Sequence, residues 1–198
     1  DGQSLQHFMS NSPWSGQAVF RQIQDEVKAT PVLHQGSVLI LDESGDEKAG
    51  THNAGAARQY NGRMGKVDLC RVDTCLAYAN ARVRLWTLVD GELFLPEEWF
   101  RDDFAGKREA LGIPQERRFE TKIELGLKMV KRAKANGLPF DLLTCDALYG
   151  RDSQFRADLE AEKVLYAAEV PANTRVYLSQ PRVGVPPKRH KKGRRPTR

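Results

Sequence analysis

Two short apolar runs, each ending in an aspartate, stand out in the pattern of hydrophobic and polar positions. The first is Ser-Val-Leu-Ile-Leu-Asp at 37–42, and the second is Phe-Asp-Leu-Leu-Thr-Cys-Asp at 140–146. Apolar runs of this length are typical of strands that are buried within a sheet. We therefore predict two buried β-strands that end at Asp42 and Asp146.

Helices are predicted at three places. In residues 15–28, apolar side chains recur at every fourth position, and Ser15 can cap the first turn. Residues 121–124, Thr-Lys-Ile-Glu, form a capping box that begins a second helix, and this helix should end at Asn136. Asp152 or Ser153 is suited to cap a third helix.

Further strands are predicted at residues 66–78, 83–95 and 164–170, where apolar residues lie between turn signals. The glycine-rich segment 43–64 is expected to be a loop or an irregular hairpin. The order is therefore helix, three strands, helix, strand, helix, strand. A run of antiparallel strands followed by β-α-β alternation indicates an α/β fold, with a mixed sheet and helices packed on it.

Composition fits a globular domain that does not cross a membrane. A chain of 198 residues with 40% hydrophobic and 29% charged residues can form one core, and no apolar run approaches the ~20 residues of a membrane span. The three cysteines contain no CxxC pair, which fits a reducing cytoplasm. Because the chain begins with Asp1, we expect it to be a piece of a longer product.

The positive charge is concentrated at the end of the chain. Residues 182–198 hold eight basic residues and no acidic one, whereas residues 1–181 hold 23 basic and 26 acidic residues. Such a basic segment can neutralise DNA phosphates, although a solubilising segment would look the same. The residues expected to bind DNA here are Lys188, Arg189, Lys191, Lys192, Arg194 and Arg195.

The two terminal aspartates suggest a metal site. A carboxylate at the end of a buried strand is costly to desolvate without a partner. If the two strands are parallel neighbours, ~4.8 Å apart, Asp42 and Asp146 can reach one divalent cation, and Mg²⁺ or Mn²⁺ prefers such oxygen ligands. The alternative is that both residues merely begin turns, where aspartate is common. The spacing alone leaves both interpretations open.

A set of ordered motifs resembles one family of insertion-sequence transposases of the DDE superfamily. The residues that carry the resemblance are Asp42 to Gly45, Lys48 to Gly50, Arg58-Gln59-Tyr60, Gly65-Lys66, Leu95 to Trp99, Thr121-Lys122, Asp146 with Tyr149-Gly150, Val170 to Thr174, and Gly184 to Pro187. Asp46 and Glu47 depart from the family pattern and add negative charge near the first aspartate, and Ala147 replaces a polar residue.

The resemblance implies a ribonuclease-H-like fold that is incomplete at the C-terminus. Residues 1–36 would be a helical lead-in, 37–178 the catalytic core, and 179–198 a basic tail. Asp42 and Asp146 would be catalytic, metal-binding acids, with Mg²⁺ or Mn²⁺ as cofactor. The family's third acid, usually a glutamate, would lie beyond this chain, because Glu169 on the last predicted strand is more typical of a solvent-facing residue.

The function implied by the resemblance is metal-dependent cleavage and strand transfer at the ends of an insertion sequence, by a fragment that is inactive alone. DNA would be the partner, and a homodimer is a further expectation. Arg58 and Tyr60 lie in a predicted flexible loop beside the acids and can contact DNA there, although a surface arginine with a packed tyrosine would look the same. Two alternatives remain: a remnant that only binds nucleic acid, and a structure-specific nuclease of the same fold. Trp86 and Trp99 are predicted to lie in the core rather than to stack on bases.

Overall fold

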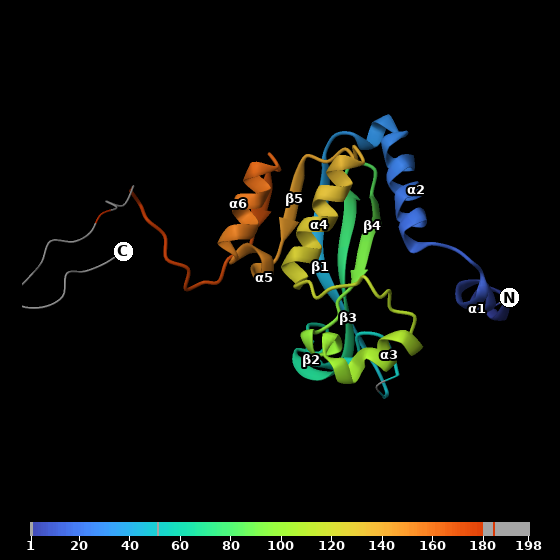
Figure 1. Cartoon of the computed structure of the whole chain (residues 1–198). Helices are drawn as coiled ribbons and strands as arrows, with labels where there is room; N and C mark the ends of the chain where they lie inside the picture. Colours follow the sequence, from blue (N-terminus) through green and yellow to red (C-terminus); the bar gives the residue numbers. More distant parts are fainter. Residues whose placement is uncertain (1, 51, 180–183, 185–198) are drawn as a thin grey trace, which may run out of the picture.

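A six-stranded mixed sheet forms the centre of the protein (Figure 1). The computed structural model describes residues 2–50, 52–179 and 184. The strand order is β2-β3-β1-β5-β6, and β4 also pairs with β3. The strands are β1 (Ser37–Glu47), β2 (Ala57–Asn61), β3 (Lys66–Asn80), β4 (Leu85–Leu93), β5 (Leu142–Cys145) and β6 (Tyr166–Ala168). The α/β fold class with a mixed sheet is thereby confirmed, and the arrangement is consistent with a ribonuclease-H-like fold.

The two apolar runs of the sequence form adjacent parallel strands. In the register of β1 with β5, Val38 lies opposite Leu142 and Leu41 lies opposite Cys145. On their outer sides, β1 pairs antiparallel with β3, and β5 pairs parallel with β6. The condition on which the proposed metal site depended, that the two strands are parallel neighbours, is therefore met.

The predicted helix starts are confirmed at all three places. Ser15, Thr121 and Asp152 each accept a hydrogen bond from a backbone N–H in the first turn of the helix that follows. The α-helices are α1 (Gly2–Asn11), α2 (Gly16–Lys28), α3 (Ala105–Ala110), α4 (Lys122–Ala135), α5 (Ala147–Gly150) and α6 (Ser153–Ala161). Short 3₁₀ turns occupy η1 (Pro31–Leu33), η2 (Glu97–Phe100) and η3 (Asp102–Phe104). Within the described ranges, no helix has the length and hydropathy needed to cross a bilayer.

The core lies between one face of the sheet and helices α2, α4 and α6. Alternate residues of a strand point to opposite faces, so Leu39 and Leu41 of β1 share the helix-covered face and are almost fully buried. They belong to the same cluster as Met129 of α4, Phe155 of α6 and Val27 of α2. Burying each such side chain contributes roughly 1.5–3 kcal/mol. This packing fixes how the helices sit over the sheet.

The prediction that Trp86 lies in the core is wrong, whereas Trp99 is fully buried as predicted. Trp86 is 75% exposed, because its position in β4 places it opposite Ala79, on the face that the core helices do not cover. The side chains of Ile40 and Leu88 lie on the same face of the sheet as Trp86 and are 38% and 41% exposed. Sequence alone does not tell which face of a two-sided apolar strand the helices will cover.

The segment 43–64 is more regular than predicted. Strand β1 continues to Glu47, where it lies opposite Cys70, and β2 pairs with the first part of β3. Strand β3 has 15 residues, which is long enough to pair with β1, β2 and β4. The mostly polar residues of β2 therefore form a strand, although they lack the apolar run of a buried strand. Helices α1 and α3 were also not predicted, and β6 is shorter than the predicted strand 164–170.

Candidate active site

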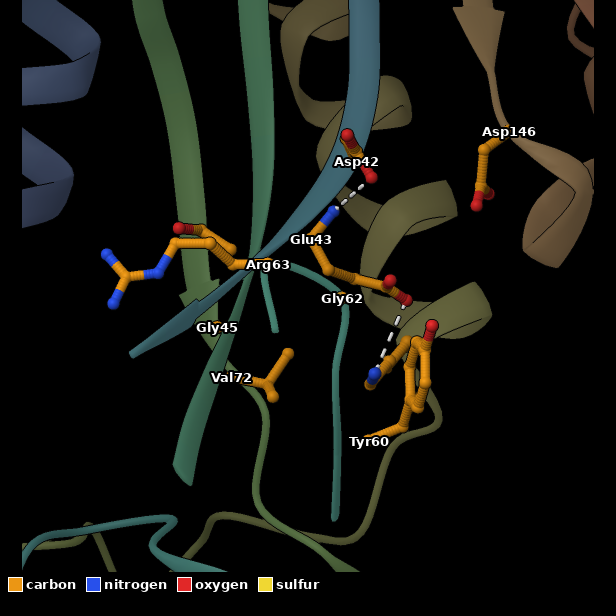
Figure 2. Close-up of a pocket in the computed structure, with 10 residues that line it drawn as sticks. Asp42, Glu43, Gly45, Tyr60, Gly62, Arg63, Val72 and Asp146 are labelled. Carbon is orange, nitrogen blue, oxygen red and sulfur yellow. Dashed lines mark hydrogen bonds and ion pairs between the residues drawn. The ribbon is translucent and has the colours of Figure 1, made fainter. Parts of the chain in front are cut away.

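The structure brings Asp42 and Asp146 to the same end of the paired part of β1 and β5. Each directly follows the last paired residues of β1 and β5, Leu41 and Cys145. Because Asp42 alternates with Leu41, and Asp146 alternates with Cys145, both acids leave the backbone on the side away from the core helices. Figure 2 shows the two carboxylates at the border of one cavity. Asp42 is exposed and Asp146 is half-buried.

Backbone N–H groups orient both carboxylates. Asp42 Oδ1 accepts a hydrogen bond from the N–H of Glu43 at 2.7 Å, and Asp146 Oδ1 accepts one from the N–H of Leu148 at 2.9 Å. The second contact also caps the short helix α5. Each contact uses one carboxylate oxygen, so the other oxygen can serve a ligand. The turn that follows each strand therefore holds its acid in place.

Gly150 at the end of α5 allows the strand next to β5 to pass closely. A Cβ atom at this position would lie 1.8 Å from the carbonyl oxygen of Glu169, which is far below any permitted contact. Glu169 in turn donates its backbone N–H to the carbonyl oxygen of Cys145 at 3.0 Å. The glycine thus keeps the end of β6 against the strand that carries Asp146.

The cavity beside the acids has a volume of about 530 Å³ and also contains cationic and aromatic side chains. Its lining residues are Asp42, Glu43, Ser44, Gly45, Tyr60, Gly62, Arg63, Val72, Lys122 and Asp146. Sequence reasoning did not single out Lys122 or Arg63 as site residues. The sequence signals for Lys122 were its place at the start of a capped helix and its membership of the Thr121-Lys122 motif. In Figure 2, the guanidinium of Arg63 points away from both aspartates.

The β2–β3 hairpin is held against β1 by a buried asparagine. The Oδ1 atom of Asn61 accepts a hydrogen bond from the N–H of Arg63 at 3.1 Å, and the backbone carbonyl of Asn61 accepts from Met64 and Gly65. A Cβ atom at Gly45 would lie 2.5 Å from that same Oδ1 atom, so only glycine permits the contact. This contact brings Tyr60, which is 59% exposed, to the wall of the cavity.

Glu43 and Lys122 form an ion pair next to the acids, marked by a dashed line from Glu43 in Figure 2. The distance from Lys122 Nζ to Glu43 Oε1 is 3.4 Å, and the two side chains are 21% and 20% exposed. Burial raises the pKa of the Glu43 carboxyl, the charges of Asp146 and Asp42 raise it further, and the Lys122 ammonium opposes them. The cavity therefore contains three carboxylates whose charges affect one another.

Of the other predicted site residues, the two that the structure describes, Arg58 and Glu169, do not line this cavity. Arg58 is exposed on β2 and is not among the residues that line the cavity. Glu169 is exposed at the end of β6 and also does not line it. The predicted DNA-binding residues Lys188 to Arg195 lie outside the described residues. Among residues 2–50, 52–179 and 184, no group of three or more histidine, cysteine, aspartate or glutamate side chains is arranged to hold a metal ion.

The comparison with protein families agrees with this geometry. A family model described as DDE superfamily endonuclease matches residues 1–198. The chain belongs to the DDE superfamily of endonucleases. The resemblance recognised in the sequence motifs is thereby confirmed.

A curated relative of this DDE family chain is a probable transposase for insertion sequence element IS701 from Microchaete diplosiphon. The two sequences are 27% identical over 172 residues, which cover 86% of this chain. The matched part is 41% of the length of the relative. The chain therefore spans less than half of the length of this relative.

Proposed function

We propose that this chain is part of an insertion-sequence transposase, in which Asp42 and Asp146 are two of the carboxylates that hold divalent metal at the DNA-cutting site. One observation supports this above the others: β1 and β5 are parallel neighbours in register, so Asp42 after Leu41 and Asp146 after Cys145 come at the same end of this strand pair, and both line one cavity. The carboxyl ends of parallel strands are where open α/β sheets place their ligands. Membership of the DDE endonucleases supports the proposed DNA-cutting activity.

The donors at this edge fit a hard cation. Both side chains offer only oxygen, and each has one oxygen that the backbone does not use in the contacts described above. Mg²⁺ and Mn²⁺ prefer such ligands and keep several waters, so two carboxylates can begin a site that further ligands complete. When bound, such ions activate a water or a 3′-hydroxyl and stabilise the leaving oxygen of a phosphodiester.

The substrate of the complete enzyme would be DNA at the ends of the element, followed by target DNA. The strand would be hydrolysed at the element end, and the freed 3′-hydroxyl would then attack the target. The third acid is expected outside this chain, so we predict that the chain alone is inactive. The basic segment of residues 182–198 would add phosphate contacts, and the protein would work in the cytoplasm, where bacterial DNA lies.

The experiment that tests the site measures Mn²⁺ binding by calorimetry and strand nicking in Mn²⁺. The variants are Asp42→Asn and Asp146→Asn, and Asp102→Asn is the matched control, because Asp102 is an exposed aspartate outside the cavity. We expect both site variants to weaken Mn²⁺ binding, and the control to leave it unchanged. Equal binding by all four proteins would refute the metal site. Robust nicking by the wild-type chain, lost in Asp146→Asn, would refute its inactivity.

A second candidate function is DNA binding without catalysis. It is favoured by the eight basic residues of the segment 182–198, and by the finding that no group of three or more histidine, cysteine, aspartate or glutamate side chains among the described residues is arranged to hold a metal ion. If this function is the right one, deletion of residues 182–198 abolishes DNA binding, while Asp42→Asn changes nothing. Binding that survives the deletion excludes this candidate.

A further inference from the structure

A lysine that sequence reasoning did not assign to the site faces the acids from helix α4. Lys122 is the first residue of α4, lines the cavity, and has its Nζ atom 3.4 Å from Glu43 Oε1. We propose that Lys122 binds a phosphate of the DNA strand held at Asp42 and Asp146, and that this phosphate displaces Glu43 as its partner. The inference rests on the proposed function, because it takes DNA as the ligand of the cavity.

The packing of α4 on β1 determines where Lys122 lies. A Cβ atom at Gly126 would lie 2.7 Å from Leu41 Cδ2, so α4 makes its close approach to the strand at this glycine. Lys122 lies four residues earlier, ~6 Å along the helix, and Glu43 lies two residues beyond Leu41, ~6.6 Å along the strand. The two steps match in length. Lys122 therefore sits beside the strand just where the acids begin.

The start of α4 is also fixed locally. The hydroxyl of Thr121 accepts a hydrogen bond from the N–H of Glu124, and the Glu124 carboxylate accepts one from the N–H of Thr121. This capping box defines the first turn, so the backbone of Lys122 does not depend on its ion pair. Only the end of the side chain is free to change partner.

The ion pair with Glu43 leaves capacity for another anion. Its distance of 3.4 Å is longer than the ~2.7–2.9 Å of a strong charge-assisted hydrogen bond, and Glu43 Oε1 has no hydrogen-bond partner within the described residues. An ammonium has three donors. A phosphate oxygen at the mouth of the cavity can therefore compete for Lys122 at little cost.

The charges around the cavity explain why a cation is needed. Three carboxylates, those of Asp42, Glu43 and Asp146, line it and repel DNA before a metal is bound. The other cation of the lining, Arg63, points away from both aspartates in Figure 2. Lys122 is thus placed to offset the repulsion next to the acid pair.

Lys128 on the same helix provides a matched control. Its Nζ atom lies 3.3 and 3.2 Å from the two carboxylate oxygens of Glu120 and 3.4 Å from Glu92, and it does not line the cavity. Removal of its charge changes the net charge of the protein as much as removal of Lys122 does. Any difference between the two substitutions therefore reflects position and not total charge.

The test measures binding of a short fluorescein-labelled nicked DNA duplex to the 198-residue chain by fluorescence anisotropy, in Mn²⁺ and over a series of KCl concentrations. We expect Lys122→Gln to weaken binding about five- to thirtyfold and to lower the slope of log Kd against log salt by about 0.9, the loss of one phosphate contact. Lys122→Arg should keep most of the affinity. Lys128→Gln should change Kd by less than about twofold, because an exposed paired charge contributes little.

The decisive readout is a double-substitution cycle with Glu43. Glu43→Gln frees Lys122 and should tighten binding, whereas in the Lys122→Gln protein the same substitution should tighten it much less. A purely structural ion pair predicts the reverse, since the loss of either partner would then weaken the protein. A thermal melt shows whether Lys122→Gln folds. If it does not fold, the tightening of binding by Glu43→Gln and the affinity of the Lys122→Arg protein still test the contact.

The outcomes separate this inference from the proposed function. Equal effects of Lys122→Gln and Lys128→Gln, or equal tightening by Glu43→Gln with and without Lys122, overturn the phosphate contact while Mn²⁺ binding still depends on Asp42. If the wild-type chain binds no duplex, the inference is also wrong. Loss of the Asp42 dependence of Mn²⁺ binding overturns the proposed function, whatever Lys122 does.

Discussion

The buried ion pair between Asp90 and Arg132 gives a stability prediction that can be worked from the structure. The Asp90 side chain is 1% exposed, and its two oxygens lie 2.7 Å from Nε and 2.7 Å from Nη2 of Arg132. Arg132 also contacts Glu92 Oε1 at 3.1 Å, so it links α4 to two acids of β4. Arg132→Met keeps most of the aliphatic volume but leaves Asp90 buried as a charge without its partner. We expect a loss of about 3–5 kcal/mol.

A loss of this size is a large part of the total stability of a domain, which is about 5–15 kcal/mol. Urea unfolding followed by circular dichroism measures it, and Arg101→Met is the control. Arg101 makes a similar two-bonded contact with Asp103, at 3.1 and 2.9 Å, but these side chains are 64% and 57% exposed. We expect the control to lose less than about 1 kcal/mol. Equal losses in the two variants would refute the argument that burial sets the cost.

Three further predictions concern other parts of the fold. Gly150→Ala should destabilise the chain by about 3 kcal/mol or more, because its Cβ atom would overlap a backbone carbonyl, and a change below about 1 kcal/mol in urea unfolding would contradict this. Thr121→Ala should cost about 1 kcal/mol. The backbone N–H of Thr121 and, next, its hydroxyl donate to the Glu124 carboxylate and lower the pKa of Glu124. The part of the loss that comes from the hydroxyl–carboxylate bond is therefore present at neutral pH and disappears as the pH falls through the folded pKa, so urea unfolding at neutral and acidic pH should show the difference between wild type and variant become smaller. Burial raises the pKa of Cys75 and of Cys145 to about 11, so iodoacetamide should label both slowly in the native chain and rapidly in urea, as mass spectrometry can record.

The acid pair could be predicted because its signals are local. A strand buried within a sheet needs an apolar run, and an aspartate at the end of such a run is visible without knowing the fold. The caps Ser15, Thr121 and Asp152 are local for the same reason, since each satisfies a backbone N–H within its own first turn. What the local pattern did not contain was the adjacency of the two strands, which the register of β1 with β5 now provides.

The remaining features depend on contacts between distant parts of the chain. Strand β2 has little apolar pattern and exists because β3 offers it an edge. Trp86 was placed on the wrong side because its exposure depends on which face the helices cover. Lys122 lines the cavity because Gly126 lets α4 approach Leu41 closely. This contact joins two distant parts of the chain, so the spacing of residues in the sequence does not predict it.

Side chains alternate between the two faces of β1, and this alternation separates Asp42 from Glu43, although the two acids are neighbours in the sequence. The side chain of Asp42 lies on the same face of β1 as Ile40, away from the core helices. The side chain of Glu43 lies on the same face as Leu41, toward α4. Lys122 pairs with Glu43 from the helix side, and within the described residues neither aspartate forms an ion pair. Asp42 and Asp146 would hold the metal ion and Lys122 would hold a phosphate, and the two ligands would be neighbours because all three side chains line the same cavity.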